Sequence, residues 1–147
     1  MTGERAERFV VFNLRLLAVS FAVVGALFIV TPDGVLEVIT DLGDEIGTFS
    51  PAPETTEQFW LALAFAYMVV IAGISLVVSL DVVRFRPLLL VLAAGKTASS
   101  LSALGFYLFD DDVFIYLLNF LVDGYLAGLS LFLWSLAGRV GEPAAPS

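Results

Sequence analysis

Four long blocks of apolar residues dominate this sequence, and they leave few folds open to it. The blocks cover about 9–30, 59–80, 87–109 and 114–136, each slightly longer than the roughly 20 residues that a transmembrane helix needs. At a rise of 1.5 Å per residue, such helices match the roughly 30 Å hydrocarbon core of a bilayer. The sequence therefore predicts an all-α polytopic membrane protein, with four transmembrane helices in an antiparallel bundle.

The composition of the chain supports the membrane assignment. Apolar residues make up 59% of the 147 residues and the mean hydropathy is +0.95, whereas soluble domains carry about 45–50% apolar residues. Four spans leave little chain for a further unit, so residues 1–140 are expected to form a single transmembrane domain. The Pro- and Ala-rich segment 141–147 is expected to be a disordered tail.

The chain contains neither cysteine nor histidine. This composition excludes haem held by histidine, zinc held by cysteine or histidine, thiol redox chemistry and Ser-His-Asp catalysis. The chain has seven basic against fifteen acidic residues, so no basic patch is present that could bind nucleic acid. We therefore expect a non-enzymatic protein with no catalytic residues, no cofactor and no metal site.

Basic residues mark one side of the membrane. Arg5, Arg8 and Arg15 precede or open span one. Arg84 and Arg86 lie between spans two and three, and Arg139 follows span four. The connections 31–57 and 110–113 hold acidic residues and no basic one. Under the positive-inside rule, this asymmetry predicts a multi-pass protein of the cell membrane with both termini in the cytoplasm.

The long connection between spans one and two contains a second apolar pattern. Apolar residues recur at three- and four-residue steps from Val35 to Ile46, with acidic residues on the opposite face. Thr31 and Pro32 are typical of a helix start, so an outer amphipathic helix is expected over about 32–46. Such a helix can be an interfacial connection or a lid over the outer mouth of the bundle. The first interpretation is favoured, since amphipathic helices commonly just rest on a surface.

Local signals set the ends of the other spans. Thr55 and Gln58 form a capping-box pattern ahead of span two, Pro87 suits the first turn of span three, and Asp112 can cap span four. The connections 81–86 and 110–113 are short, and short connections place consecutive helices side by side. Spans two, three and four are therefore expected to form an antiparallel row.

Lys96 and Asp123 are the only charged residues deep inside the predicted spans. A full charge near the bilayer centre costs roughly 2.5–3.5 kcal/mol on insertion scales, so such a residue usually has a partner or a function. Counted from the ends of their spans, the two residues differ in depth by about 5 Å. An extended lysine covers that distance, so we expect an intramembrane polar centre built on this pair.

Further polar residues are placed to join this centre: Asn119, Ser99, Ser100 and Arg15. Asn119 lies one helical turn from Asp123, and the two serines lie about one turn from Lys96. Arg15 either extends to the interface or points inward as a third charged member. The centre is either a structural lock between spans three and four or a site for a proton or a substrate. The sequence favours neither role over the other.

Span four also carries a close-approach motif, Gly124-x-x-x-Gly128, beside Asp123. Small residues at this spacing let helix backbones pack tightly. Packing within one chain is the favoured role, because small-xxx-small patterns occur in most helical bundles, and a homodimer seam is the alternative.

One stretch of the chain resembles a known family. Arg15-Leu16-Leu17 enters an apolar helix, Gly25 lies within it, and Pro32 lies just past its end. This arrangement resembles the opening of DoxX-like small four-helix bacterial membrane proteins. The resemblance covers residues 12–32 and implies a four-helix membrane fold, but no functional residue follows from it. Small multidrug transporters share the size and the four spans, but their pattern requires a buried glutamate in span one, where this chain has Arg15.

Two functions are open to such a chain. The favoured one is a small integral membrane protein that acts as an accessory subunit or ligand-binding component of a membrane assembly. The other is a small oligomeric transporter or proton-coupled carrier that uses Asp123 and Lys96. The expected partners are the lipid bilayer and either a membrane protein or further copies of the chain. An aqueous path to Asp123 would favour transport, whereas a dry pair with an exposed seam would favour a subunit.

Overall fold

The computed structural model describes residues 3–51 and 58–140. These residues form six helices: α1 (Gly3–Val30), α2 (Pro32–Ile46), α3 (Gln58–Leu80), α4 (Val82–Phe85), α5 (Leu88–Phe109) and α6 (Phe114–Val140). Four of them, α1, α3, α5 and α6, are long and apolar enough to cross a membrane. Within the described ranges, β-structure is limited to a single bridge between Ser50 and Val113. The predicted all-α polytopic fold is therefore confirmed.

The first and last helices extend beyond their apolar blocks. α1 begins at Gly3 and α6 continues to Val140. The added turns are more polar. Glu4 in the first turn of α1 and Arg139 in the last turn of α6 suit the positive and negative ends of the helix dipoles. These turns lie against each other, since a β carbon added to Gly3 would be 3.5 Å from the carbonyl oxygen of Val140.

The amphipathic helix predicted over 32–46 is present as α2, with the same bounds. Thr31 occupies its N-cap position but makes no capping hydrogen bond; its hydroxyl donates to the carbonyl oxygen of Leu27 at 3.4 Å. Two other predictions lie outside the described residues: the capping box that begins at Thr55, and the tail 141–147.

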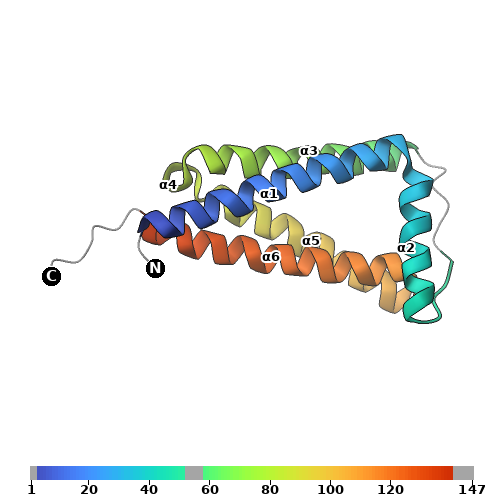
Figure 1. Cartoon of the computed structure of the whole chain (residues 1–147). Coiled ribbons are helices and arrows are strands. Elements are labelled where there is room, and N and C mark those ends of the chain that lie inside the picture. The colour runs from blue at the N-terminus through green and yellow to red at the C-terminus, as the bar shows by residue number, and fades with distance from the viewer. Residues whose placement is uncertain (1–2, 52–57, 141–147) are drawn as a thin grey trace.

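The four spans pack as two pairs. α5 runs antiparallel along α6, and α1 runs antiparallel along α3 (Figure 1). α1 also crosses α6, whereas α3 and α5 touch over a short stretch only. The prediction that span three packs along span two is therefore wrong, because α1 and not α5 runs along the length of α3. The short helix α4, which contacts both α3 and α6, separates the two consecutive spans, and α1 takes the place beside α3.

The core lies toward the end of the bundle that holds both chain termini. Its buried side chains come from all four spans: Val10 and Leu14 of α1, Val78 of α3, Leu89 of α5, and Leu133 of α6. A second layer of Leu17, Ile71 and Leu92 continues the core along the bundle. Because lipid tails are as apolar as leucine, such a core is stabilised in a membrane by close packing rather than by burial from water.

Arg86 fastens the turn before α5 to the end of α6. Its Nε donates a hydrogen bond to the carbonyl oxygen of Trp134 at 2.9 Å, and its guanidinium lies 4.3 Å from the centroid of the Trp134 ring. Gly138 makes room for this side chain, since a β carbon there would be 2.8 Å from one guanidinium nitrogen. The contact closes the end of the bundle at which α6 finishes.

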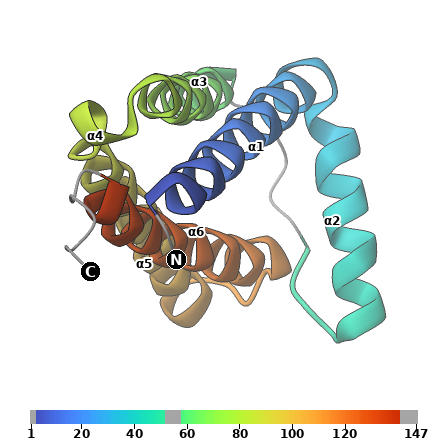
Figure 2. The same ribbon diagram turned by 60° about the vertical axis from the view of Figure 1, so that its left-hand side comes forward.

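The two helix pairs diverge toward the opposite end, and α2 lies across that end (Figures 1 and 2). α2 contacts both α6 and α1. Its buried residue, Gly43, abuts the side chain of Phe114 at the start of α6. The segment after α2 is held by Ser50, whose hydroxyl donates to Oδ1 of Asp112 at 2.5 Å. The sequence suggested Asp112 as the cap of α6; its carboxylate instead accepts this bond.

The docked face of α2 differs from the full apolar face of the sequence pattern. Ile39 and Thr40 are half-buried beside Gly43, whereas Leu42 and Ile46 are exposed. The difference arises because α2 packs where the glycine allows a close approach to α6, not where its apolar side chains are largest. Part of the apolar face of α2 therefore stays uncovered, beside its acidic residues.

Replacing Gly43 with alanine is expected to weaken the docking of α2 on α6. A β carbon at this position would lie 2.9 Å from three carbon atoms of the Phe114 side chain, including its Cβ. The ring or the backbone must then shift, and overpacking of this kind costs about 1–3 kcal/mol. Thermal unfolding in detergent micelles should therefore show a less stable protein.

Gly34→Ala, on the same helix, is the matched control. A β carbon there would have its nearest neighbour at 3.7 Å, and alanine favours a helix over glycine by up to ~1 kcal/mol. This variant should be at least as stable as the parent protein. Equal stability of the Gly43 and Gly34 variants would show that α2 does not pack on Phe114.

Candidate functional site

Lys96 and Asp123 form an ion pair in the middle of the bundle. Nζ of Lys96 lies 2.7 Å from Oδ1 of Asp123, and the two residues are 3% and 4% exposed. This separation is typical of a charge-assisted hydrogen bond. The antiparallel packing of α5 on α6 thus joins the two charges that the sequence places at similar depth.

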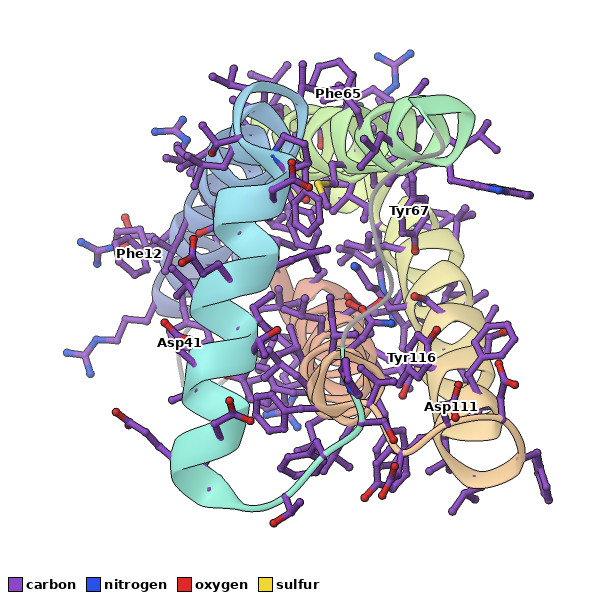
Figure 3. All side chains as sticks on the ribbon, turned by 90° about the vertical axis from the view of Figure 1, so that its right-hand side faces the viewer. Phe12, Asp41, Phe65, Tyr67, Asp111 and Tyr116 are labelled. Atoms are coloured by element: carbon purple, nitrogen blue, oxygen red, sulfur yellow. The ribbon has the colours of Figure 1, made fainter. Side chains whose placement is uncertain are left out.

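Two aromatic rings complete the surroundings of the Lys96 ammonium group. Nζ lies 4.2 Å from the centroid of the Phe21 ring in α1 and 5.2 Å from that of Tyr67 in α3. Both distances fall within the ~6 Å range of cation–π attraction, which strengthens where water is excluded. Tyr67 reaches from α3 toward α5 (Figure 3), where its hydroxyl comes close to Gly95. The ammonium group therefore has a partner on each of the other three spans.

Phe21 and Tyr67 were not among the residues predicted for the centre, because that prediction joined charged, amide and serine side chains of spans three and four to Arg15 and included no aromatic ring. Helical spacing offers a signal for both rings. Phe21 follows the buried Leu14 and Leu17 on one face of α1, and Tyr67 precedes the buried Ile71 by one turn of α3. Inward-facing aromatic residues near the depth of a buried lysine are candidates for cation–π contact.

Two further hydrogen bonds join α5 to α6 beside the ion pair. Oγ of Ser100 donates to the carbonyl oxygen of Phe120 at 2.8 Å, and Nδ2 of Asn119 donates to Oγ of Ser99 at 3.3 Å. Ser100 is buried, whereas Asn119 and Ser99 are half-buried. Every buried side-chain nitrogen and oxygen within the described ranges has a hydrogen-bond partner. The polar centre therefore satisfies its own groups.

Arg15 lies outside this centre. Its side chain is exposed on α1, while its neighbours Leu14 and Leu17 are buried in the core. The structure therefore brings together Lys96, Asp123, Asn119 and the two serines, and it leaves Arg15 on the outer surface. A long charged side chain near the end of a span can extend toward the interface.

The two glycines of the α6 motif face different surroundings. A β carbon on Gly124 would lie 3.1 Å from Oγ of Ser100, so its missing side chain lets α5 approach α6 at the polar centre. A β carbon on Gly128 would have no atom within 4 Å. Gly124 thus contributes to packing inside the chain, whereas Gly128 lies in open space near the 70% exposed Tyr125.

The arrangement is suited to holding two opposite charges in place. Lys96 and Asp123 neutralise each other, and the Phe21 and Tyr67 rings lie around the ammonium group, where they partly offset the water that it has lost. Removing one partner would leave the other charged and buried, which is the costly case. The geometry therefore fits a lock between spans, and a site that moves a proton would need to open this pair.

Comparisons with known proteins do not assign this chain to a family. No protein-family model matches the chain, and no curated protein or solved structure shows significant similarity to it. The resemblance of residues 12–32 to DoxX-like proteins therefore stays a prediction.

A double-mutant cycle tests whether the ion pair holds α5 to α6. Asp123→Asn or Lys96→Met alone leaves one buried charge without its partner, and breaking a buried pair costs about 3–5 kcal/mol in soluble proteins. A lower value is expected in a membrane, where interhelical hydrogen bonds average ~0.6 kcal/mol. The double variant should recover much of the loss, because neither charge then remains.

The measured quantity is the free energy of unfolding in mixed micelles for the parent, both single variants and the double variant. Thr97→Val, on the exposed side of α5, is the control and should change stability little. If the two single effects simply add in the double variant, the charges contribute no mutual stabilisation.

Proposed function

We propose that this chain is a non-enzymatic accessory subunit of a membrane assembly, with Lys96 and Asp123 as an internal structural lock. The burial of the pair carries this proposal, since the two residues are only 3% and 4% exposed. A transported ion or substrate needs an aqueous path to the charge that binds it. The dry pair and its two aromatic neighbours instead link all four spans. The bundle then forms a rigid surface against which another membrane protein can pack.

The outward side of α6 is the surface proposed for that partner. Four of its exposed residues follow one another at helical steps: Leu121, Tyr125, Gly128 and Phe132. Open space at Gly128, beside the projecting Tyr125, suits the close approach of a further transmembrane helix. A second copy of the chain or a different membrane protein can supply that helix. We call these four residues the α6 seam.

The proposed location is the cell membrane, with both termini in the cytoplasm and α2 on the outer side. Arg5, Arg84 and Arg139 support this orientation, because they belong to the end of the bundle that holds the termini. The opposite end carries the acidic residues of 33–45 and 110–112 without a basic residue. The positive-inside rule favours the cytoplasm for the basic end.

Photocrosslinking at Tyr125 tests the α6 seam. Tyr125 replaced by p-benzoylphenylalanine should give a discrete protein adduct in intact membranes, because a packed partner helix would hold the reactive group against one surface. The same replacement at Leu76, which is 50% exposed on α3, is the control and should react with lipid. Lipid adducts alone at both positions would remove the support for a subunit that uses this seam.

A proton-coupled carrier is the second candidate, favoured by one feature of the polar centre. Asn119 and Ser99 are half-buried and lie about one turn from the ion pair, on the side nearer to α2. Tyr67, whose ring contacts Lys96, is 37% exposed. In a carrier, these groups would form the first steps of a polar route from the α2 end to Asp123.

Cysteine accessibility separates the two candidates, because the chain contains no cysteine of its own. Asn119→Cys should resist a membrane-impermeant thiol reagent if the pair is a dry lock, whereas a carrier would expose this position to water. Asp41→Cys on the exposed side of α2 should react in intact cells. Arg139→Cys should react only after permeabilisation.

Each outcome of this labelling series is informative. Modification of Asn119→Cys as fast as Asp41→Cys would favour the carrier over the lock. Reaction of Arg139→Cys but not Asp41→Cys in intact cells would reverse the proposed orientation. Leu133→Cys, in the buried core, gives the labelling rate of a fully protected position.

A further inference from the structure

A cavity of about 280 Å³ lies between α2 and the start of α6. α2 contributes Ile39, Thr40 and Asp44 to its wall, and the following segment contributes Phe49 and Ser50. Ile115 of α6 is part of the opposite wall. The cavity is separate from the polar centre, because Asp123 lies nine residues beyond Phe114, about 13 Å along the helix.

The walls of this cavity are fixed by contacts that do not depend on a ligand. Ser50 donates a hydrogen bond to Asp112 at 2.5 Å and pairs with Val113 in an isolated β-bridge. The Phe49 ring packs on the Phe114 ring with centroids 5.0 Å apart. On the other side, Gly43 abuts Phe114 and sets the approach of α2. These contacts hold the walls of the cavity in place without a ligand.

The lining combines an apolar surface with a few oxygen atoms. Ile39, Phe49 and Ile115 offer hydrocarbon, while Thr40 and Ser50 offer hydroxyl groups and Asp44 offers a carboxylate. Asp44 is exposed, and no basic side chain lies between Arg15 and Arg84 in the sequence to neutralise it. A few convergent polar groups in an apolar cavity are typical of sites for small organic molecules.

The local charge selects the sign of the ligand. The N-terminus of α6 contributes the equivalent of roughly half a positive charge. Against it stand Asp44 and the three carboxylates of Asp110, Asp111 and Asp112 just before α6. Figure 3 looks onto this end and shows Asp41 of α2 and Asp111 on it. The net charge around the cavity is strongly negative, so the cavity attracts cations and repels anions.

We propose that this cavity binds a small organic cation: a primary ammonium group carried on an aromatic or short alkyl body. The apolar body would lie against Phe49, Ile39 and Ile115. The ammonium group would face the Asp44 carboxylate and the hydroxyl groups of Thr40 and Ser50. The volume is slightly below the usual range of 300–1,000 Å³ for ligand sites, which limits the ligand to a small molecule. This inference does not rest on the role proposed for the Lys96–Asp123 pair.

Methyl NMR of the full chain in nanodiscs of zwitterionic lipid tests the proposal. The probes are phenethylammonium, the neutral 2-phenylethanol and the anionic phenylacetate, which share an aromatic body and differ in charge. Phenethylammonium should shift the methyl signals of Ile39 and Ile115 in a saturable way and leave the core residue Ile71 unchanged. 2-Phenylethanol should bind about fivefold more weakly, the effect of one partly exposed charge pair. Phenylacetate should give no saturable shift of these methyl signals.

Two variants and one control locate the effect. Asp44→Asn should remove the preference for the ammonium probe over the alcohol, and Ile39→Trp should fill the cavity and abolish the saturable shift at Ile115. Asp41→Asn is the matched control, since it removes an equal charge from the same helix without lining the cavity, and it should keep most of the preference. An unchanged Ile71 signal confirms that each variant is folded.

Three results would overturn the proposal. The first is equal affinity for the ammonium and alcohol probes in the parent protein. The second is a linear shift of the same size at Ile46, which is exposed and outside the cavity, because that pattern reports partition into the bilayer surface. The third is a set of contacts between Ile115 and lipid chains that persist throughout the titration, because a lipid would then occupy the cavity.

Discussion

Two opposite charges in a medium that cannot solvate them constrain this bundle more than any other contact. Lys96 and Asp123 must meet, and meeting sets the register of α5 against α6 and the face that each helix turns inward. Ser100, Asn119 and the gap at Gly124 follow from that register, since they lie within about one turn of the pair. The Phe21 and Tyr67 rings then extend the constraint to α1 and α3. Packing alone would specify this arrangement less strongly, because neighbouring helices gain little over lipid tails.

The remaining architecture depends on how the two ends of the bundle are closed. At one end, the four spans share a continuous apolar core and Arg86 fastens a turn to α6. At the other end, the helix pairs diverge, and closure depends on α2. Gly43 and Phe49 pack on Phe114, and Ser50 bonds to Asp112 and pairs with Val113. The firm end is therefore built by many interdigitating side chains, and the α2 end by a few specific contacts. The proposed ligand cavity lies at the second end, where packing leaves space.

The apolar blocks were sufficient to predict the four spans, because length and hydrophobicity alone decide what can cross a bilayer. The meeting of Lys96 with Asp123 was also predictable, since depth along a span follows from residue counting. Other features depend on pairings that no short segment encodes. The position of α1 between α3 and α6 is one, because short connections suggest that α5 should lie beside α3. The face of α2 that docks is another, because Gly43 decides it through Phe114, a residue far along the chain.

The spacing of the locked charges along the chain has a consequence for biosynthesis. Lys96 precedes Asp123 by 27 residues, so the ribosome releases the cation well before its partner. α5 and α6 are also the less apolar of the four spans, and a lone lysine at the centre of such a helix opposes its transfer into lipid. We therefore expect the two helices to leave the translocation channel together, as one hairpin in which the charges already neutralise each other. On this expectation, α5 enters the membrane stably only after α6 has been translated.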